Sequence, residues 1–96
     1  MPAEHWYVFI VRCTDGSLYT GVNGDIERTV IELNAGRGSA YTKSRLPVFL
    51  AYTEEYMNES DALKRANLIK RLSRSAKEDL LSIPNIGSIG EPAYGI

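Results

Sequence analysis

Short apolar segments alternate with polar breaks along the chain, and their spacing predicts both strands and helices. Residues 6–13 and 18–22 are rich in β-branched and aromatic side chains, which favours two strands. The break at 14–17 contains Asp15-Gly16, a pair typical of tight hairpin turns that need positive φ angles. We therefore expect the chain to open with an antiparallel hairpin.

A helical period follows the hairpin. Asp25 is placed to cap a helix in which Ile26, Val30 and Leu33 recur on one face. Glycines then end the helix, and residues 36–47 are expected to form a basic loop that contains Gly, Ser and Tyr.

The second half of the chain predicts a third strand and two further helices. Residues 48–53 are apolar and strand-sized. Ser60 is expected to cap the second helix, and Ser73 or Ser75 the third, which covers about 76–82. The order is then ββ-α-β-αα, an α+β domain in which helices flank a small antiparallel sheet of about three strands.

The regular pattern stops near residue 84. We expect a domain over 1–83 and an irregular C-terminal tail over 84–96, where Gly and Pro recur without an apolar period. No apolar run approaches the ~20 residues of a membrane span, and the first residues lack the layout of a signal peptide. Cys13 is the single cysteine, so no internal disulfide can form. A cytoplasmic location without a membrane partner is therefore expected.

The distribution of charge along the chain is more informative about function than the net charge. The hydrophobic fraction of 44% and the charged fraction of 24% are ordinary, and the net charge of −1 does not favour a dedicated nucleic-acid binder. Residues 36–77, however, hold nine basic and four acidic side chains, whereas 1–35 hold two and five and 78–96 none and three. This basic segment indicates either a surface for phosphates or a solvated helix face.

Five short motifs then stand in order without an insertion or deletion. They are YVFIVRC (7–13), DGSLYTG (15–21), NAGRGSAYT (34–42), SDAL (60–63) and IKRLSR (69–74). Together they resemble the GIY-YIG nuclease superfamily over about 6–81, specifically its small stand-alone bacterial type, which is related to the GIY-YIG domain of the excision-repair nuclease subunit. The resemblance implies a phosphodiester hydrolase in which a tyrosine activates water. An arginine, often with a histidine, steadies the phosphate, and a glutamate holds Mg²⁺ or Mn²⁺.

Most of these family positions carry other residues here. The first signature tyrosine falls on Phe9, the helix arginine on Thr29 and the histidine on Leu33. The glutamate that holds the metal falls on Ala66, which offers no oxygen to a hard cation. Tyr19 alone of the five retains the family's residue. The resemblance therefore implies a degenerate catalytic site, and we expect a pseudo-enzyme with no metal ligand and no cofactor.

Two geometric expectations follow from these assignments. Phe9, Leu33 and Ala66 should lie around one concavity beside Tyr19. Arg28 precedes the helix arginine position by one residue, and because one residue turns about 100° around a helix, Arg28 should face elsewhere.

Three functions remain open. The first is an inactive nuclease that retains weak, non-specific binding of DNA or RNA through the basic segment. The second is a protein-interaction or regulatory scaffold that self-associates or binds a protein partner. The third is an active metal-dependent DNA endonuclease with a relocated site. The candidate nucleic-acid contacts are Arg37, Tyr41, Lys43, Arg45, Lys70, Arg71 and Arg74.

Overall fold

The predicted hairpin opens the structure, a computed structural model that describes residues 5–82. Strands β1 (Trp6–Cys13) and β2 (Leu18–Asn23) pair antiparallel, and the Cys13 N–H donates to the Ser17 carbonyl (2.8 Å) across the turn. Gly16 has a φ of 87°, in the left-handed region that glycine adopts at no steric cost. Asp15 does not have a positive φ. The expected tail at 84–96 and the domain's last residue at 83 lie outside the described residues.

The other elements follow in the predicted order with one addition. They are α1 (Ile26–Asn34), α2 (Ala40–Lys43), β3 (Val48–Tyr56), α3 (Glu59–Lys70) and α4 (Arg74–Ser82). The short helix α2 forms inside the segment expected to be a loop, where Ser39 accepts the N–H of Thr42 (3.2 Å). The α+β class and the three-stranded antiparallel sheet, with the order β2-β1-β3, are confirmed.

Side-chain caps set where the helices begin. Asp25 caps α1 as predicted and accepts the N–H three residues on (3.0 Å). Ser73 accepts an N–H of the first turn of α4 in the same way (3.1 Å). The cap predicted at Ser60 is wrong, because Asn58 caps α3 two residues earlier (2.8 Å). Asn and Ser cap helices about equally well, so residue type could not choose between the two positions.

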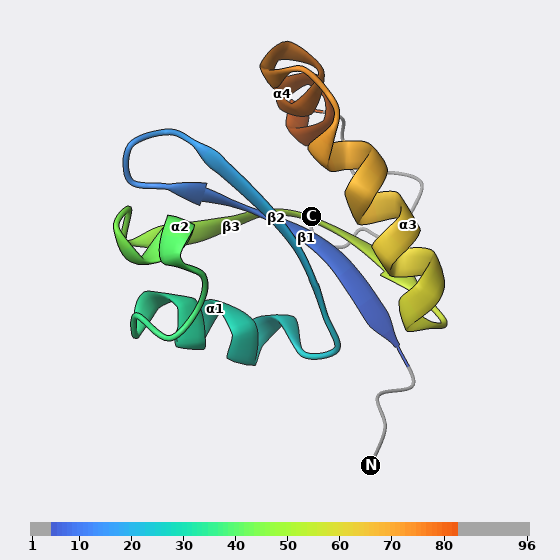
Figure 1. The fold of residues 1–96 in the computed structure, drawn as a ribbon, viewed down its shortest axis with the longest axis horizontal. Coiled ribbons are helices and arrows are strands. Elements are labelled where there is room, and N and C mark those ends of the chain that lie inside the picture. Colours follow the sequence, from blue (N-terminus) through green and yellow to red (C-terminus); the bar gives the residue numbers. More distant parts are fainter. Residues whose placement is uncertain (1–4, 83–96) are drawn as a thin grey trace.

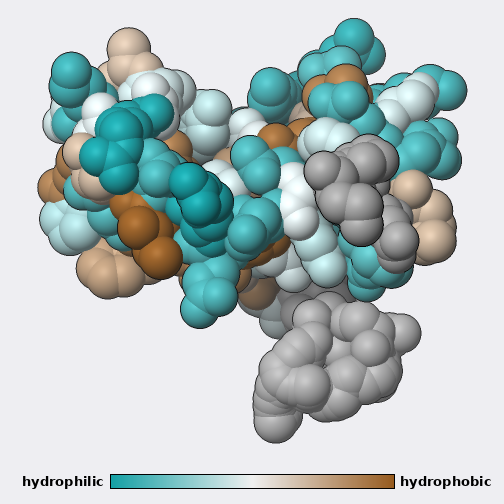
Figure 2. All heavy atoms as spheres, turned by 90° about the horizontal axis from the view of Figure 1, so that it is seen from below, coloured by the Kyte–Doolittle hydropathy of each residue, from teal (hydrophilic) through white to brown (hydrophobic). Residues whose placement is uncertain are grey.

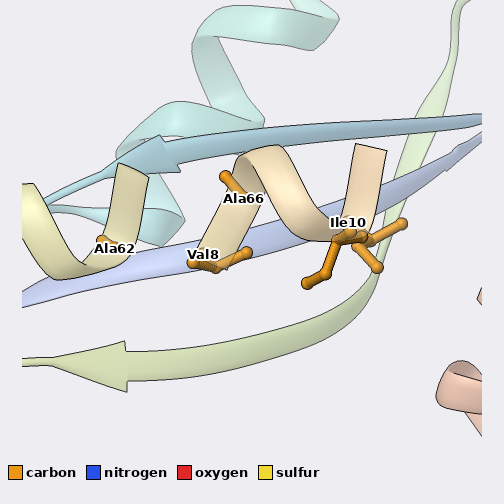
Figure 3. Close-up of a cluster of buried hydrophobic side chains, with 5 residues drawn as sticks. Val8, Ile10, Ala62 and Ala66 are labelled. Atoms are coloured by element: carbon orange, nitrogen blue, oxygen red, sulfur yellow. The ribbon is translucent and has the colours of Figure 1, made fainter. Parts of the chain in front are cut away.

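Alternation along the central strand β1 supplies two separate cores. Val8 and Ile10 point toward α3 and pack with Ala62, Ala66 and Ile69, as Figure 3 shows for the labelled side chains. The intervening residues of β1 point the other way. Helices α1 and α2 therefore lie on one side of the sheet and α3 and α4 on the other (Figure 1).

The second core lies under α1. Phe9, Val11 and Cys13 pack there with Leu33 and Val48. Asn34, the last residue of α1, joins this helix to β3. Its side-chain amide donates to the Val48 carbonyl (3.0 Å), and its oxygen accepts the Val48 N–H (2.7 Å).

A polar cluster joins α3 to β3. Arg65 donates two hydrogen bonds to Glu54 (2.9 and 3.0 Å), and Tyr52 and Tyr56 each donate one to the same carboxylate. Burial acts to raise the pKa of Glu54, but these hydrogen bonds outweigh it and hold the pKa below its ordinary value. Burial, together with the hydrogen bond to Glu54, raises the pKa of Tyr56 to about 12. Every polar group of the cluster thus has a partner, which indicates a structural role.

Among the described residues, no helix combines the length and the apolar character needed to cross a membrane.

Candidate functional site

A pocket of about 360 Å³ opens between the hairpin, α1 and the segment after α1. Four of the five positions that the resemblance singles out line it, namely Phe9, Tyr19, Thr29 and Leu33. The structure therefore brings these four positions together as the sequence predicts.

The floor of the pocket is apolar. Phe9 and Leu33 are 3% and 5% exposed. Gly21 lies directly against the ring of Phe9, because a Cβ added there would come 2.6 Å from the Phe9 Cζ. A Cβ at Gly38 would likewise collide with Leu33. These two side chains are packed against the backbone of two glycines. Neither can act as an acid, a base or a phosphate ligand, the roles that the resemblance assigns to their positions.

The wall formed by α1 differs from the expectation at one position. Thr29 donates its hydroxyl to the Asp25 carbonyl (2.7 Å), so this group serves the first turn of the helix. Arg28 lines the pocket, and the expectation that it faces elsewhere is wrong. A helical position fixes the direction of the Cα–Cβ bond, but a long arginine side chain can lie along the helix surface and reach a neighbouring face.

The pocket's rim carries an ion pair. Arg37 donates to Glu32 (2.5 Å), and this hydrogen bond lowers the pKa of Glu32 and raises that of Arg37. Of the described residues that line the pocket, Glu32 is the only one with a carboxylate. That carboxylate is already engaged by a cation.

Ala66 is not part of this pocket. It is 2% exposed and lies between α3 and the sheet, against Val8 and Ile10 (Figure 3). The expectation that Ala66 shares a concavity with Phe9 is therefore wrong, because adjacent residues of β1 point to opposite faces and α3 covers the other one. A side chain at position 66 has no access to the pocket across the sheet.

These residues do not fit the metal site that the GIY-YIG resemblance implies. A hard divalent cation takes six or more oxygen ligands, of which carboxylates are the strongest. The resemblance implies one glutamate ligand, but the pocket's single carboxylate, Glu32, is engaged by Arg37, and within residues 5–82 no group of three His, Cys, Asp or Glu side chains is placed to hold a metal ion. The pocket therefore offers Mg²⁺ or Mn²⁺ no carboxylate that is not already paired.

Next to the pocket, an aromatic pair joins β2 to α2. The rings of Tyr19 and Tyr41 stack with centroids 6.1 Å apart, and the guanidinium of Arg45 lies 3.8 Å from the centroid of Tyr41. Arg45 also pairs with Asp15 in the hairpin turn (3.1 Å). Tyr19 thus presents a stacked ring at the edge of the pocket.

The predicted nucleic-acid contacts are distributed over more than one site. Arg37, Tyr41 and Arg45 lie at or near the pocket as just described, whereas Arg74 pairs with Glu78 (2.9 Å) and donates to the Gly16 carbonyl (2.8 Å). Lys70 lines a second cavity, on the far side of Tyr19. Lys43 and Arg71 are exposed and line neither cavity.

Two cations that line the cavities were not among the site residues predicted from the sequence. Arg28 belongs to the first pocket and Lys77 to the second. Both belong to amphipathic helices, and only the packing of those helices on the sheet brings them to the cavities. The length of the arginine side chain was the one available signal for Arg28.

The hairpin, the sheet order and the pocket at its signature positions define a small α+β domain of the GIY-YIG class. A family model described as the GIY-YIG catalytic domain matches residues 5–79, and the chain belongs to that family.

Relatives within the family are of similar size. UPF0213 protein SSP2268 of Staphylococcus saprophyticus is 51% identical over 76 residues, which cover 79% of this chain and 93% of the relative. UPF0213 protein VNG_2274C of Halobacterium salinarum is 46% identical, with 77% and 96% covered. Among solved structures, the UPF0213 protein BH0048 from Bacillus halodurans is similar with a TM-score of 0.54 at 37% identity, covering 81% of this chain and 83% of that one.

Proposed function

We propose that this protein binds the phosphodiester backbone of nucleic acid in the pocket beside α1 and does not cleave it by the metal-dependent route of GIY-YIG nucleases. The observation that carries the proposal is the composition of the pocket. It retains Tyr19 and is lined by Arg28, while its floor is apolar and its one carboxylate is paired with Arg37. An arginine and an aromatic ring can bind a phosphate. Without a metal ligand beside them, they are better suited to binding the phosphate than to hydrolysing it.

The charges limit the strength of this binding. Arg37 shares its charge with Glu32, and the chain as a whole has a net charge of −1. We therefore expect a dissociation constant no tighter than the ~10⁻⁴–10⁻⁶ M typical of non-specific binders at physiological salt. Contacts to phosphate carry no information on base identity, so the affinity should depend little on sequence.

The test combines binding and cleavage. DNA and RNA oligonucleotides are titrated at low and at physiological ionic strength, and the same oligonucleotides are incubated with Mg²⁺ and with Mn²⁺. We expect salt-sensitive binding that Arg28→Ala weakens and that Lys64→Ala, an exposed lysine that lines neither cavity, leaves unchanged.

Two results would contradict the proposal in different ways. Cleavage that disappears in EDTA and in Tyr19→Phe would refute the inactive site and support a relocated one. The absence of binding at low ionic strength would refute the nucleic-acid partner.

An interaction scaffold is the second candidate, and exposed apolar side chains favour it. Ile31, Phe49 and Leu50 are 60%, 62% and 46% exposed, the last two on the edge strand β3. Figure 2 shows such hydrophobic patches among mostly hydrophilic residues on one face. Sedimentation equilibrium of the wild type and of Phe49→Glu tests this function. A self-associating scaffold requires that the wild type forms an assembly and that the substitution dissociates it.

A further inference from the structure

A second cavity, of about 380 Å³, lies beyond Tyr19. Its lining consists of Leu18, Tyr19, Thr20, Tyr41, Lys70 and Lys77. Tyr19 lines both cavities, so the two meet at one side chain. Leu18 packs toward the α3 core and Tyr19 toward the α1 core, and β2 is an edge strand. The second cavity therefore follows the open edge of β2 from one face of the sheet to the other.

Two unneutralised cations face this cavity. Lys70 ends α3 and Lys77 lies in α4, and among residues 5–82 neither makes an ion pair. The lining contains no carboxylate. Four other cations of the basic segment are held in ion pairs, namely Arg37, Arg45, Arg65 and Arg74. The charges of the two lysines in the second cavity are thus not compensated by an ion pair, whereas most arginines of the basic segment pair with a carboxylate.

An ion-pair network ties α4, the helix that carries Lys77, to the hairpin. Arg12 of β1 donates two hydrogen bonds to Glu78 (2.7 and 3.0 Å), and Arg74 donates a third (2.9 Å). Arg74 also donates to the Gly16 carbonyl in the hairpin turn (2.8 Å). Leu80 and Leu81 add apolar contacts to the core under α3. These contacts hold the backbone of α4 where the Lys77 side chain lines the second cavity.

We propose that the second cavity is a further phosphate subsite, in which Lys70 and Lys77 contact the same nucleic-acid chain that Arg28 contacts in the first pocket. This inference rests on the proposed function. A backbone that joins the two subsites crosses the stacked rings of Tyr19 and Tyr41 at the edge of β2. Occupying both therefore requires several nucleotides, whereas a very short ligand fills only one subsite.

The test compares oligonucleotide length with the loss of each subsite. A dinucleotide and an oligonucleotide of about a dozen residues, each as DNA and as RNA, are titrated over a range of salt concentrations. The proteins are the wild type, Arg28→Ala, the double variant Lys70→Ala/Lys77→Ala and the control Lys64→Glu. The control lowers the net charge by the same amount as the double variant, at an exposed residue that lines neither cavity. Thermal unfolding of each variant verifies that it is folded.

We expect the double variant to flatten the log–log salt slope of the long single strand by about 1.4, since each phosphate contact contributes about 0.7. The slope of the control should stay as in the wild type, and the double variant should lose less affinity for the dinucleotide, which spans one subsite, than for the long strand, which spans both. An unchanged slope in the double variant, with weaker binding in Arg28→Ala, overturns the second subsite and leaves the proposed function intact. Equal losses in the double variant and the control also overturn it. No binding by the folded wild type at low ionic strength overturns both.

Discussion

Single positions decide what the pocket can do. Phe9, Tyr19 and Leu33 could be assigned to one site from the sequence because the motifs around them resemble those of the GIY-YIG family. Ala66 could not, because its surroundings depend on which side of the sheet α3 packs. That choice is made by tertiary packing, and no short motif encodes it.

The buried position of Ala66 gives a first prediction. Ala66→Glu would place a carboxylate between α3 and the sheet, at a site 2% exposed and lined by Val8 and Ile10. We expect a loss of about 3 kcal/mol or more in the free energy of unfolding, measured by urea denaturation, and no gain of nuclease activity. Asn67→Glu, at the neighbouring exposed position, should stay within about 0.5 kcal/mol of the wild type. Wild-type stability in Ala66→Glu would show that position 66 is open to solvent.

The contact between Gly21 and Phe9 gives a second prediction. Gly21→Ala places a methyl group 2.6 Å from the Phe9 ring, so the ring or the strand must shift. Overpacking of this kind costs about 1–3 kcal/mol. The unfolding free energy of Gly21→Ala/Phe9→Leu should exceed the value expected from adding the two single changes, because the smaller side chain relieves the collision. Strict additivity would indicate that the two residues do not touch.

At the scale of elements, the strands and the start of α1 were predictable because alternation, turn residues and a capping aspartate all agreed. The short helix α2 was missed because its four residues follow Gly36, Gly38 and Ser39, and such a sequence is equally typical of a loop. The docking of α4 through Leu80 and Leu81 could be expected from their apolar side chains. Its ion pairs could not, because they join residues far apart in the sequence, Arg12 and Glu78 among them.

That docking should respond to pH. The hydrogen bonds from Arg12 and Arg74 lower the pKa of Glu78 to about 2, below the ~4.3 of an unfolded chain. A lowered pKa in the folded state adds stability that is present above about pH 4.3 and disappears as the pH falls toward 2. The melting temperature of Glu78→Gln should therefore lie below that of the wild type at neutral pH, and the difference should close near pH 2. Asp79→Asn is the control, because Asp79 lies in the same helix and makes no ion pair among the described residues. A constant difference at all pH values would contradict the role of the Glu78 charge.

At the scale of the whole molecule, the count of basic residues overstates the charge that a ligand meets. Nine cations lie in 36–77, but ion pairs within the fold hold Arg37, Arg45, Arg65 and Arg74. Three cations line the cavities without an ion pair among residues 5–82: Lys70 and Lys77, which belong to these nine, and Arg28, which lies outside the segment. Composition located the basic segment, but only the structure separates its structural cations from the others.

This difference is measurable as the salt dependence of nucleic-acid binding. Three phosphate contacts give a log–log slope of about 2–3, whereas contacts from all nine cations of 36–77 would give about 6–8. Fluorescence anisotropy of a labelled oligonucleotide, from low to physiological salt, distinguishes the two. A slope near the larger value would mean that nucleic acid displaces the internal ion pairs.

The central strand β1 also separates the effects of substitutions on the two faces of the sheet. Successive residues of β1 serve different cores, so a substitution under α1 and one under α3 communicate only through the backbone of one strand. Energetic effects on the two faces should then add nearly independently. One face can lose or acquire chemical groups over many generations while the other keeps the chain folded. In a domain of this size, such a separation lets the residues that line the pocket change without passing through an unfolded ancestor.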